Sequence, residues 1–279
     1  MKKITLKYTC AVISGLLLNV SLVSAQKSSD MQEGNLLVSK IKVDGNSNDW
    51  TTPLKAFNKS TGLHYTVAND DKKIYIIIQT SEVNTTRKIL MGGITFSINA
   101  DGKKKSAELA SLTYPVITGN SRRSAMGGGG SQRSFGNYQT MTQAQRDSMQ
   151  LAFGQRQLEA AKDIKIHGFK TVTDTLVSIY NEYSIKAMAT LNATGTYTYE
   201  IAIPLALLPV DTDKEFGYNV KVNGLQMRNL NSGNNTSRLG GGNGGGRPAG
   251  GTPSGGRGGF DFQDLMTPTD FSGKYTLAK

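Results

Sequence analysis

The sequence predicts an all-β protein, folded as a two-sheet antiparallel β-sandwich. Three observations support this prediction. About ten segments either alternate apolar and polar residues or are short β-branched runs, as β-strands do. The linkers between them are short and rich in Gly, Asn, Asp and Pro, the residues that favour turns. Helical segments do not alternate with strands, so a parallel sheet of βα units is not expected.

The first strand is expected at residues 36–43, where Ile41 and Val43 alternate with lysines. A polar turn at residues 44–50 follows it. Asp44 favours a turn by bonding to nearby backbone, and Gly45 does so by tolerating a positive φ. Trp50, the only tryptophan of the chain, closes this turn. We expect Trp50 to fill one end of the sandwich rather than to face a ligand.

The next strands follow in hairpin order. Residues 63–67 and 74–79 flank the polar linker 69–73 and are predicted to pair as a hairpin. The run of isoleucines in the second of these strands indicates a strand covered on both faces. Residues 93–98 alternate cleanly, and a further strand is expected within 107–118, where Pro115 indicates either an edge strand or a strand end.

An insertion at residues 119–162 is expected to interrupt the β region. Its first part is rich in glycine and flexible by composition. Thr142 and Gln145 form a capping-box pattern that starts one helix, which continues to about Lys162. Met149, Phe153 and Leu158 are predicted to share one face of that helix, and Gly154 to weaken it. We expect the helix to pack across a sheet end.

Strands then resume at 163–167, 176–180, 183–189, 196–203, 216–227 and 271–277, with a short helical turn at 205–208. A second insertion at 231–259 is a glycine-rich, low-complexity loop. The predicted organisation is therefore a flexible leader at 26–35 and a single domain at 36–279. That domain is a jelly-roll or immunoglobulin-like sandwich with one inserted helix and two glycine-rich loops.

The first 25 residues have the pattern of a signal peptide: a basic start, a short apolar run and small residues up to Ala25. We therefore expect an exported protein that is periplasmic, cell-surface or extracellular. No later stretch is long and apolar enough to predict a transmembrane segment. Cys10, the only cysteine, lies within the signal peptide, so disulfides, thiolate metal sites and cysteine nucleophiles are not expected in the mature chain.

The formal net charge of the sequence is +11. This charge favours solubility and weak attraction to acidic envelope polymers. Nucleic-acid binding is not expected, because the chain carries an export signal and lacks a basic face interleaved with aromatic residues. Many of the cations lie beside glycines or in turns: Arg122, Arg123, Arg133, Arg238, Arg247 and Arg257.

Three stretches, 43–50, 67–75 and 199–204, resemble in order and spacing the family 9 carbohydrate-binding modules and the wider DOMON-like sandwiches. The resemblance spans most of the mature chain. It implies a two-sheet sandwich that binds sugars and in some members holds structural calcium. Sugar binders of this family clamp a terminal sugar ring between two tryptophans, whereas Trp50 here is alone. Other aromatic residues would have to replace the clamp, and the candidates are Tyr114, Phe135, Tyr138, Phe260 and Phe262. The alternative role of these residues is to pack the ends of the loops onto the sandwich.

The turn at 44–49 is the main candidate calcium site, and Asp70 and Asp71 allow the same two interpretations. Asp44, Asn46, Asn48 and Asp49 place several oxygen ligands within one turn, and calcium prefers such ligands. The spacing is not that of an EF-hand loop, and turn formation explains the same residues equally well. No other cofactor is predicted.

Catalysis is not expected. His64 and His167 are the only histidines, and neither lies near a nucleophile motif. A b-type haem, which some DOMON-like domains hold, would need axial ligands from these histidines or from Met91 or Met227, and no spacing pairs them.

The function expected is therefore binding of a glycan or envelope component by an exported, non-catalytic module. Two alternatives stay open. One is a structural or assembly protein of the envelope with flexible basic loops, and the other is a haem-binding redox domain.

Overall fold

The computed structural model describes residues 30–39, 41–101, 107–117, 141–225 and 262–279 of the chain. One sheet contains the strands β1 (Ala56–Asn58), β2 (Leu63–Asn69), β3 (Lys73–Thr80), β9 (Tyr197–Pro204) and β8 (Lys186–Leu191), in that spatial order. The other contains β11 (Thr269–Tyr275), β10 (Phe216–Val222), β4 (Ile94–Asn99), β5 (Ala110–Tyr114), β6 (Asp163–His167) and β7 (Leu176–Ser178).

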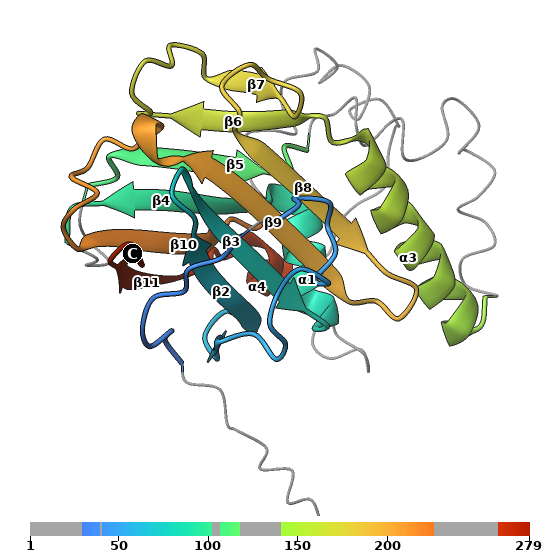
Figure 1. The fold of residues 1–279 in the computed structure, drawn as a ribbon. Coiled ribbons are helices and arrows are strands. Elements are labelled where there is room, and N and C mark those ends of the chain that lie inside the picture. Colours follow the sequence, from blue (N-terminus) through green and yellow to red (C-terminus); the bar gives the residue numbers. More distant parts are fainter. Residues whose placement is uncertain (1–29, 40, 102–106, 118–140, 226–261) are drawn as a thin grey trace, which may run out of the picture.

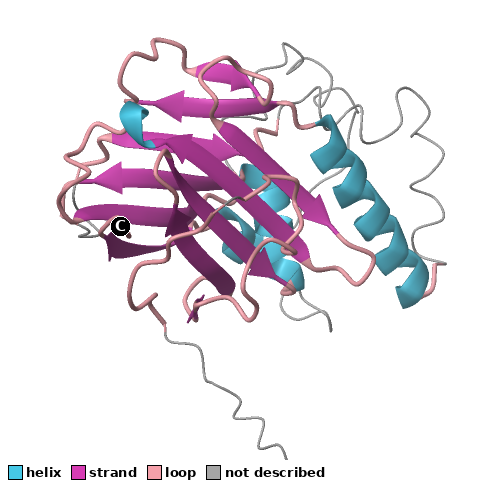
Figure 2. Cartoon of the chain, viewed as in Figure 1, coloured by secondary structure: helices cyan, strands magenta, loops and turns pink. Residues whose placement is uncertain are grey.

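The two sheets are stacked, with β3, β9 and β8 crossing in front of β4, β5 and β10 in Figure 1. Figure 2 shows strands dominating the molecule, with α3 at one side of it. All neighbouring strands within each sheet are antiparallel. The predicted all-β, two-sheet antiparallel sandwich is therefore confirmed.

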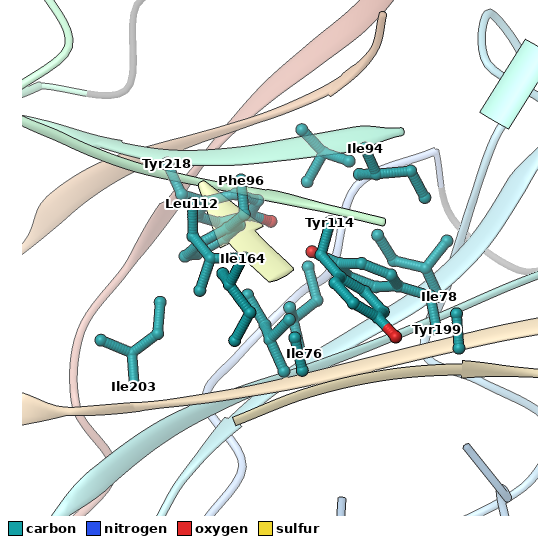
Figure 3. Close-up of a cluster of buried hydrophobic side chains, with 14 of the residues drawn as sticks. Ile76, Ile78, Ile94, Phe96, Leu112, Tyr114, Ile164, Tyr199, Ile203 and Tyr218 are labelled. Atoms are coloured by element: carbon teal, nitrogen blue, oxygen red, sulfur yellow. The ribbon is translucent and has the colours of Figure 1, made fainter. Parts of the chain in front are cut away.

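The main core lies between the sheets. Because side chains alternate along a strand, every second residue of the central strands points into this layer. Ile76 and Ile78 of β3 meet Ile94 and Phe96 of β4 there, and all four side chains are at most 1% exposed (Figure 3). The other face of β3 is covered as well, which confirms the prediction made from its run of isoleucines.

Residues 41–54, drawn in blue in Figure 1, cross the outer face of the five-stranded sheet. Trp50 and Leu54 of this segment pack with Tyr75 and Ile77 of β3 in a second, smaller core. Trp50 is only 6% exposed, so its structural role is confirmed. The predicted location was wrong, since Trp50 lies on a sheet face and not at the end of the sandwich.

Glu200 of β9 anchors this crossing segment. Its side chain is fully buried on the outer sheet face, and its carboxylate accepts three N–H bonds. The donors are Nε1 of Trp50 at 2.7 Å, the backbone N–H of Gly45 at 2.7 Å and that of Asp44 at 3.0 Å. Burial raises the pKa of Glu200, although these three donors favour its ionised form. Gly45 has the predicted positive φ of 81°.

The strand predicted at residues 36–43 is wrong. Leu37 makes only an isolated parallel bridge to Asn69, with Val38 N–H donating to the Asn69 carbonyl at 2.9 Å. Gln32, from the segment predicted as a flexible leader, is fixed to the sheet through its side-chain amide. That amide donates to the Val67 carbonyl at 2.8 Å and accepts from the Val67 N–H at 2.7 Å.

The inserted helix is α3 (Gln143–Ala160), and it begins with the predicted capping box of Thr142 and Gln145. It packs beside β8, the edge strand of the five-stranded sheet (Figure 1). The predicted apolar face is partly wrong: Leu158 is buried, but Met149 is 39% exposed. Gly154 instead faces the protein, and the glycine-rich parts of both insertions lie outside the described residues.

Two further helices complete the fold. Helix α1 (Val83–Gly92) was not predicted, because Asn84, Thr85 and Thr86 in its first turn have low helix propensity. Near its end, the Leu90 carbonyl accepts from Nε2 of Gln157 of α3 at 2.5 Å. Helix α4 (Phe262–Met266) is short. In the described part of the chain, no helix combines the length and apolarity that a membrane crossing requires.

Candidate functional site

A surface pocket of about 340 Å³ lies at one end of the outer face of the five-stranded sheet. Residues 41–54 cover the other part of this face. The described residues that line the pocket come from β1, β2, β3, the start of α1 and the turn before β9: Phe57, Gly62, His64, Gln79, Thr80, Ser81, Glu82 and Thr196.

Strand register assembles the floor of the pocket. Phe57 of β1 is paired with His64 of β2, and His64 is paired with Gln79 of β3. Residues paired across antiparallel strands point to the same face, so these three side chains form one row. The rings of Phe57 and His64 lie 4.4 Å apart between centroids, with 32° between their planes. The row is therefore an aromatic surface that continues into an amide.

Polar groups surround this floor. Gln79 Nε2 donates to Thr198 Oγ1 at 3.1 Å, and the hydroxyls of Ser81 and Thr196 share a hydrogen bond of 3.2 Å. Glu82 precedes α1 at its N-cap position, and its Oε2 accepts from the hydroxyl of Thr85 at 3.1 Å. The pocket thus combines a carboxylate, hydroxyls and an amide.

Gly62 makes room for this carboxylate. A β-carbon at residue 62 would lie 2.2 Å from Oε2 of Glu82, far inside van der Waals contact. The φ of Gly62 is +67°, a conformation that favours glycine over every residue with a side chain. The position of Glu82 over the pocket thus depends on a glycine in the turn between β1 and β2.

The charge of the pocket is set by Glu82. It is the one acid among the described lining residues, and these include no lysine or arginine. Partial burial lowers the pKa of His64, against the opposing effect of Glu82. The imidazole is therefore neutral at pH 7, and the described lining carries a single negative charge.

None of the described residues that line this pocket is among the predicted sugar contacts. Tyr114 is 1% exposed in the main core, and its hydroxyl donates to the Ala161 carbonyl at 3.1 Å. It has no ring face open to a ligand, so that prediction is corrected: inward-facing positions of β5 fill the space between the sheets. Phe135, Tyr138 and Phe260 lie outside the described residues. Phe262 begins α4, and its side chain is likewise outside the described part.

The oxygens of the candidate calcium turn take part in the turn itself. Asp44 Oδ1 accepts from the N–H of Asn46 at 3.0 Å, and its Oδ2 lies 3.0 Å from Nζ of Lys42. Asp49 Oδ2 accepts from the N–H of Lys42 at 2.9 Å. No group of three or more His, Cys, Asp and Glu side chains suited to a metal occurs among the described residues. Calcium binding by Asp44, Asn46, Asn48 and Asp49 stays a prediction, which a calcium titration followed by thermal unfolding tests.

The two histidines considered for haem do not face each other. His64 points outward from the five-stranded sheet, and His167 is exposed on the outer side of β6 in the other sheet. They lie on opposite faces of the sandwich and so cannot be the axial pair of one haem.

Sequence reasoning missed Phe57, His64, Gln79 and Glu82 as a site. Their proximity depends on strand register and on a helix that the sequence analysis did not find. The sequence holds a local signal for only one pair of these residues. Phe57 and His64 flank the short turn around Gly62, and such a turn pairs the strands on either side of it.

Comparisons with known proteins do not assign a family. No protein-family model matches the sequence, and no curated protein matches it. One similar solved structure is a family 9 carbohydrate-binding module from Caldicellulosiruptor kristjanssonii in complex with glucose. The match has 10% sequence identity, covers 70% of this chain and 80% of that chain, and has a TM-score of 0.28. It assigns neither family nor ligand to this chain.

Proposed function

We propose that this chain is an exported, non-catalytic carbohydrate-binding protein, and that the pocket on the five-stranded sheet holds the glycan. The observation that carries the proposal is the row of Phe57, His64 and Gln79, bordered by the Ser81 hydroxyl and the Glu82 carboxylate. An aromatic ring offers an apolar surface for the C–H face of a sugar, and polar groups around it orient the hydroxyls.

The same lining argues for binding without hydrolysis. Glycoside hydrolysis generally uses two carboxylates placed on either side of the scissile bond. Glu82 is the one carboxylate among the described lining residues. The arrangement therefore supports recognition of a sugar rather than cleavage of its glycosidic bond.

Substitution of Phe57 tests this proposal. We expect Phe57→Ala to weaken binding of a recognised glycan about tenfold, which corresponds to about 1.4 kcal/mol and is the size of an aromatic contact. The measurement is isothermal titration calorimetry of the wild type and the variant against the best ligand of a glycan array. Thermal unfolding of both proteins shows whether Phe57→Ala remains folded.

Tyr180→Ala is the matched control. Tyr180 is an aromatic residue that is 78% exposed beyond β7 of the other sheet, so its loss is expected to leave glycan affinity unchanged. Equal affinities for Phe57→Ala and the wild type would place the glycan elsewhere. An array on which no glycan is bound would refute the function itself.

A further inference from the structure

The described lining of the pocket is negatively charged, although the whole chain carries a formal charge of +11. We propose that the pocket selects sugars that bear a free, protonated amino group and discriminates against sugars that bear a carboxylate. This inference rests on the proposed function, since it names the class of glycan for the same pocket. The described lining and the chain as a whole therefore carry charges of opposite sign, and a positive net charge favours acidic polymers rather than amino sugars.

The Glu82 carboxylate is available to a ligand. Its side chain is exposed, and Thr85 is its one hydrogen-bond donor among the described residues, acting on Oε2. No ion pair with Glu82 occurs in the described part of the chain. An ammonium group entering the pocket therefore meets a carboxylate that is not already neutralised.

The neighbouring groups do not reverse this charge. His64 is the other titratable side chain among the described lining residues, and at pH 7 its imidazole is neutral. Thr80, Ser81 and Thr196 contribute hydroxyls, and Gln79 contributes an amide. A sugar carboxylate would thus meet no cation among the described lining residues and would face Glu82 as a like charge, which is unfavourable.

Gly62 and Phe57 make the selection geometrically feasible. The bare Cα of Gly62 allows the Glu82 carboxylate to lie against the turn between β1 and β2. Phe57 leads into that turn from β1 and lines the same pocket. A pyranose ring packed on Phe57 would therefore lie in the same pocket that Glu82 lines.

Three methyl glycosides of similar size test the inference: those of glucosamine, glucose and glucuronic acid. We expect the amino sugar to bind about two- to fivefold more tightly than the neutral sugar, the range for an exposed ion pair, and the uronate to bind most weakly. Affinities are measured by NMR titration of the mature protein at neutral pH and low salt. In about 1 M salt, where the Debye length is ~3 Å, the differences should shrink.

Glu82→Gln is the decisive variant. It keeps the size of the side chain and a carbonyl acceptor for Thr85 but removes the charge, so the three glycosides should bind with similar affinity. Asp71→Asn makes the same change on the turn at the opposite end of the β2–β3 hairpin and should keep the wild-type order of affinities.

The outcomes separate the two proposals. Equal binding of all three glycosides to the wild type overturns the charge selection and leaves carbohydrate binding in place. An amino-sugar preference that survives in Glu82→Gln also overturns the inference, because the charge responsible would lie elsewhere. If no glycoside or longer glycan binds at all, the proposed function fails, and the inference fails with it.

Discussion

Glu200 shows how a single buried residue ties distant parts of this chain together. It lies on β9, and its three donors come from the turn at residues 44–50, the closest of them 150 residues away in sequence. A buried carboxylate without donors would be strongly unfavourable, and a turn without this acceptor would leave three N–H groups unpaired. Each therefore requires the other, which fixes residues 41–54 on the sheet.

The pKa of Glu200 gives a prediction about pH. Burial raises this pKa above the ordinary value of 4.5, so the folded chain binds the proton more tightly than the unfolded chain does. The Glu200 contribution to the free energy of unfolding should therefore fall as pH rises from 4.5 through the raised pKa, and stay constant above it. Urea unfolding of the wild type and Glu200→Gln across this range measures the difference.

The sign of that difference is informative. If the wild type instead gains stability relative to Glu200→Gln as pH rises, the three N–H donors stabilise the carboxylate by more than burial penalises it. Glu200→Gln is a suitable reference for the wild type, because glutamine has nearly the shape of glutamate and does not titrate.

At the residue scale, the sequence predicted one half of this interaction. A lone tryptophan next to an Asp-Gly turn indicated a structural role for Trp50, and that role is confirmed. Glu200 was not identified, because a strand residue flanked by apolar neighbours gives no sign of which turn will cross above it. Pairing over such a separation depends on the assembled sheet.

At the scale of elements, α3 shows that a glycine in a helix can be required by packing. Gly154 was predicted only to weaken the helix. In the fold, a β-carbon there would lie 3.0 Å from Leu191 Cδ2 of β8 and 3.0 Å from Leu90 Cδ1 of α1. The missing side chain lets α3 approach both elements closely.

This leads to a prediction for Gly154→Ala. In an exposed helix interior, Gly→Ala adds about 1 kcal/mol to the free energy of unfolding. At residue 154 the new methyl group would overpack against two leucines, so we expect a net loss of about 1 kcal/mol or more. Urea unfolding measures it, with Ser148→Ala as a control at an exposed position of α3, where a small gain is expected. A gain of the full ~1 kcal/mol for Gly154→Ala would show that α3 has room to move away from β8.

The elements were predictable where their signals are local. The β2–β3 hairpin, the end of β5 at Pro115 and the capping box of α3 were all recovered from turn and cap residues. Residues 36–43 alternate like a strand, but their pairing with the sheet is limited to the isolated bridge between Leu37 and Asn69 at the end of β2, and β1 pairs with the other end of β2. Alternation of apolar and polar residues indicates a half-buried extended segment. A segment that crosses a sheet face shows this alternation just as a strand within the sheet does.

At the scale of the whole molecule, the proposed site depends on how much of the outer face of the five-stranded sheet residues 41–54 cover. Residues 41–54 cover the part of the five-stranded sheet around Tyr75 and Ile77, and they do not cover the row from Phe57 to Gln79. The sandwich was predicted from local patterns. The site was not, because it depends on which part of a sheet face a distant segment leaves uncovered.

The central claim is that a glycan binds at this open row. The most direct test is to map ¹H–¹⁵N chemical-shift changes of the protein as a recognised glycan is added. We predict that the largest changes occur at the backbone and side-chain signals of Phe57, His64, Gln79, Ser81 and Glu82, while the Trp50 indole signal stays unchanged. Changes concentrated on the six-stranded sheet, or no changes with any glycan of the panel, would contradict the claim.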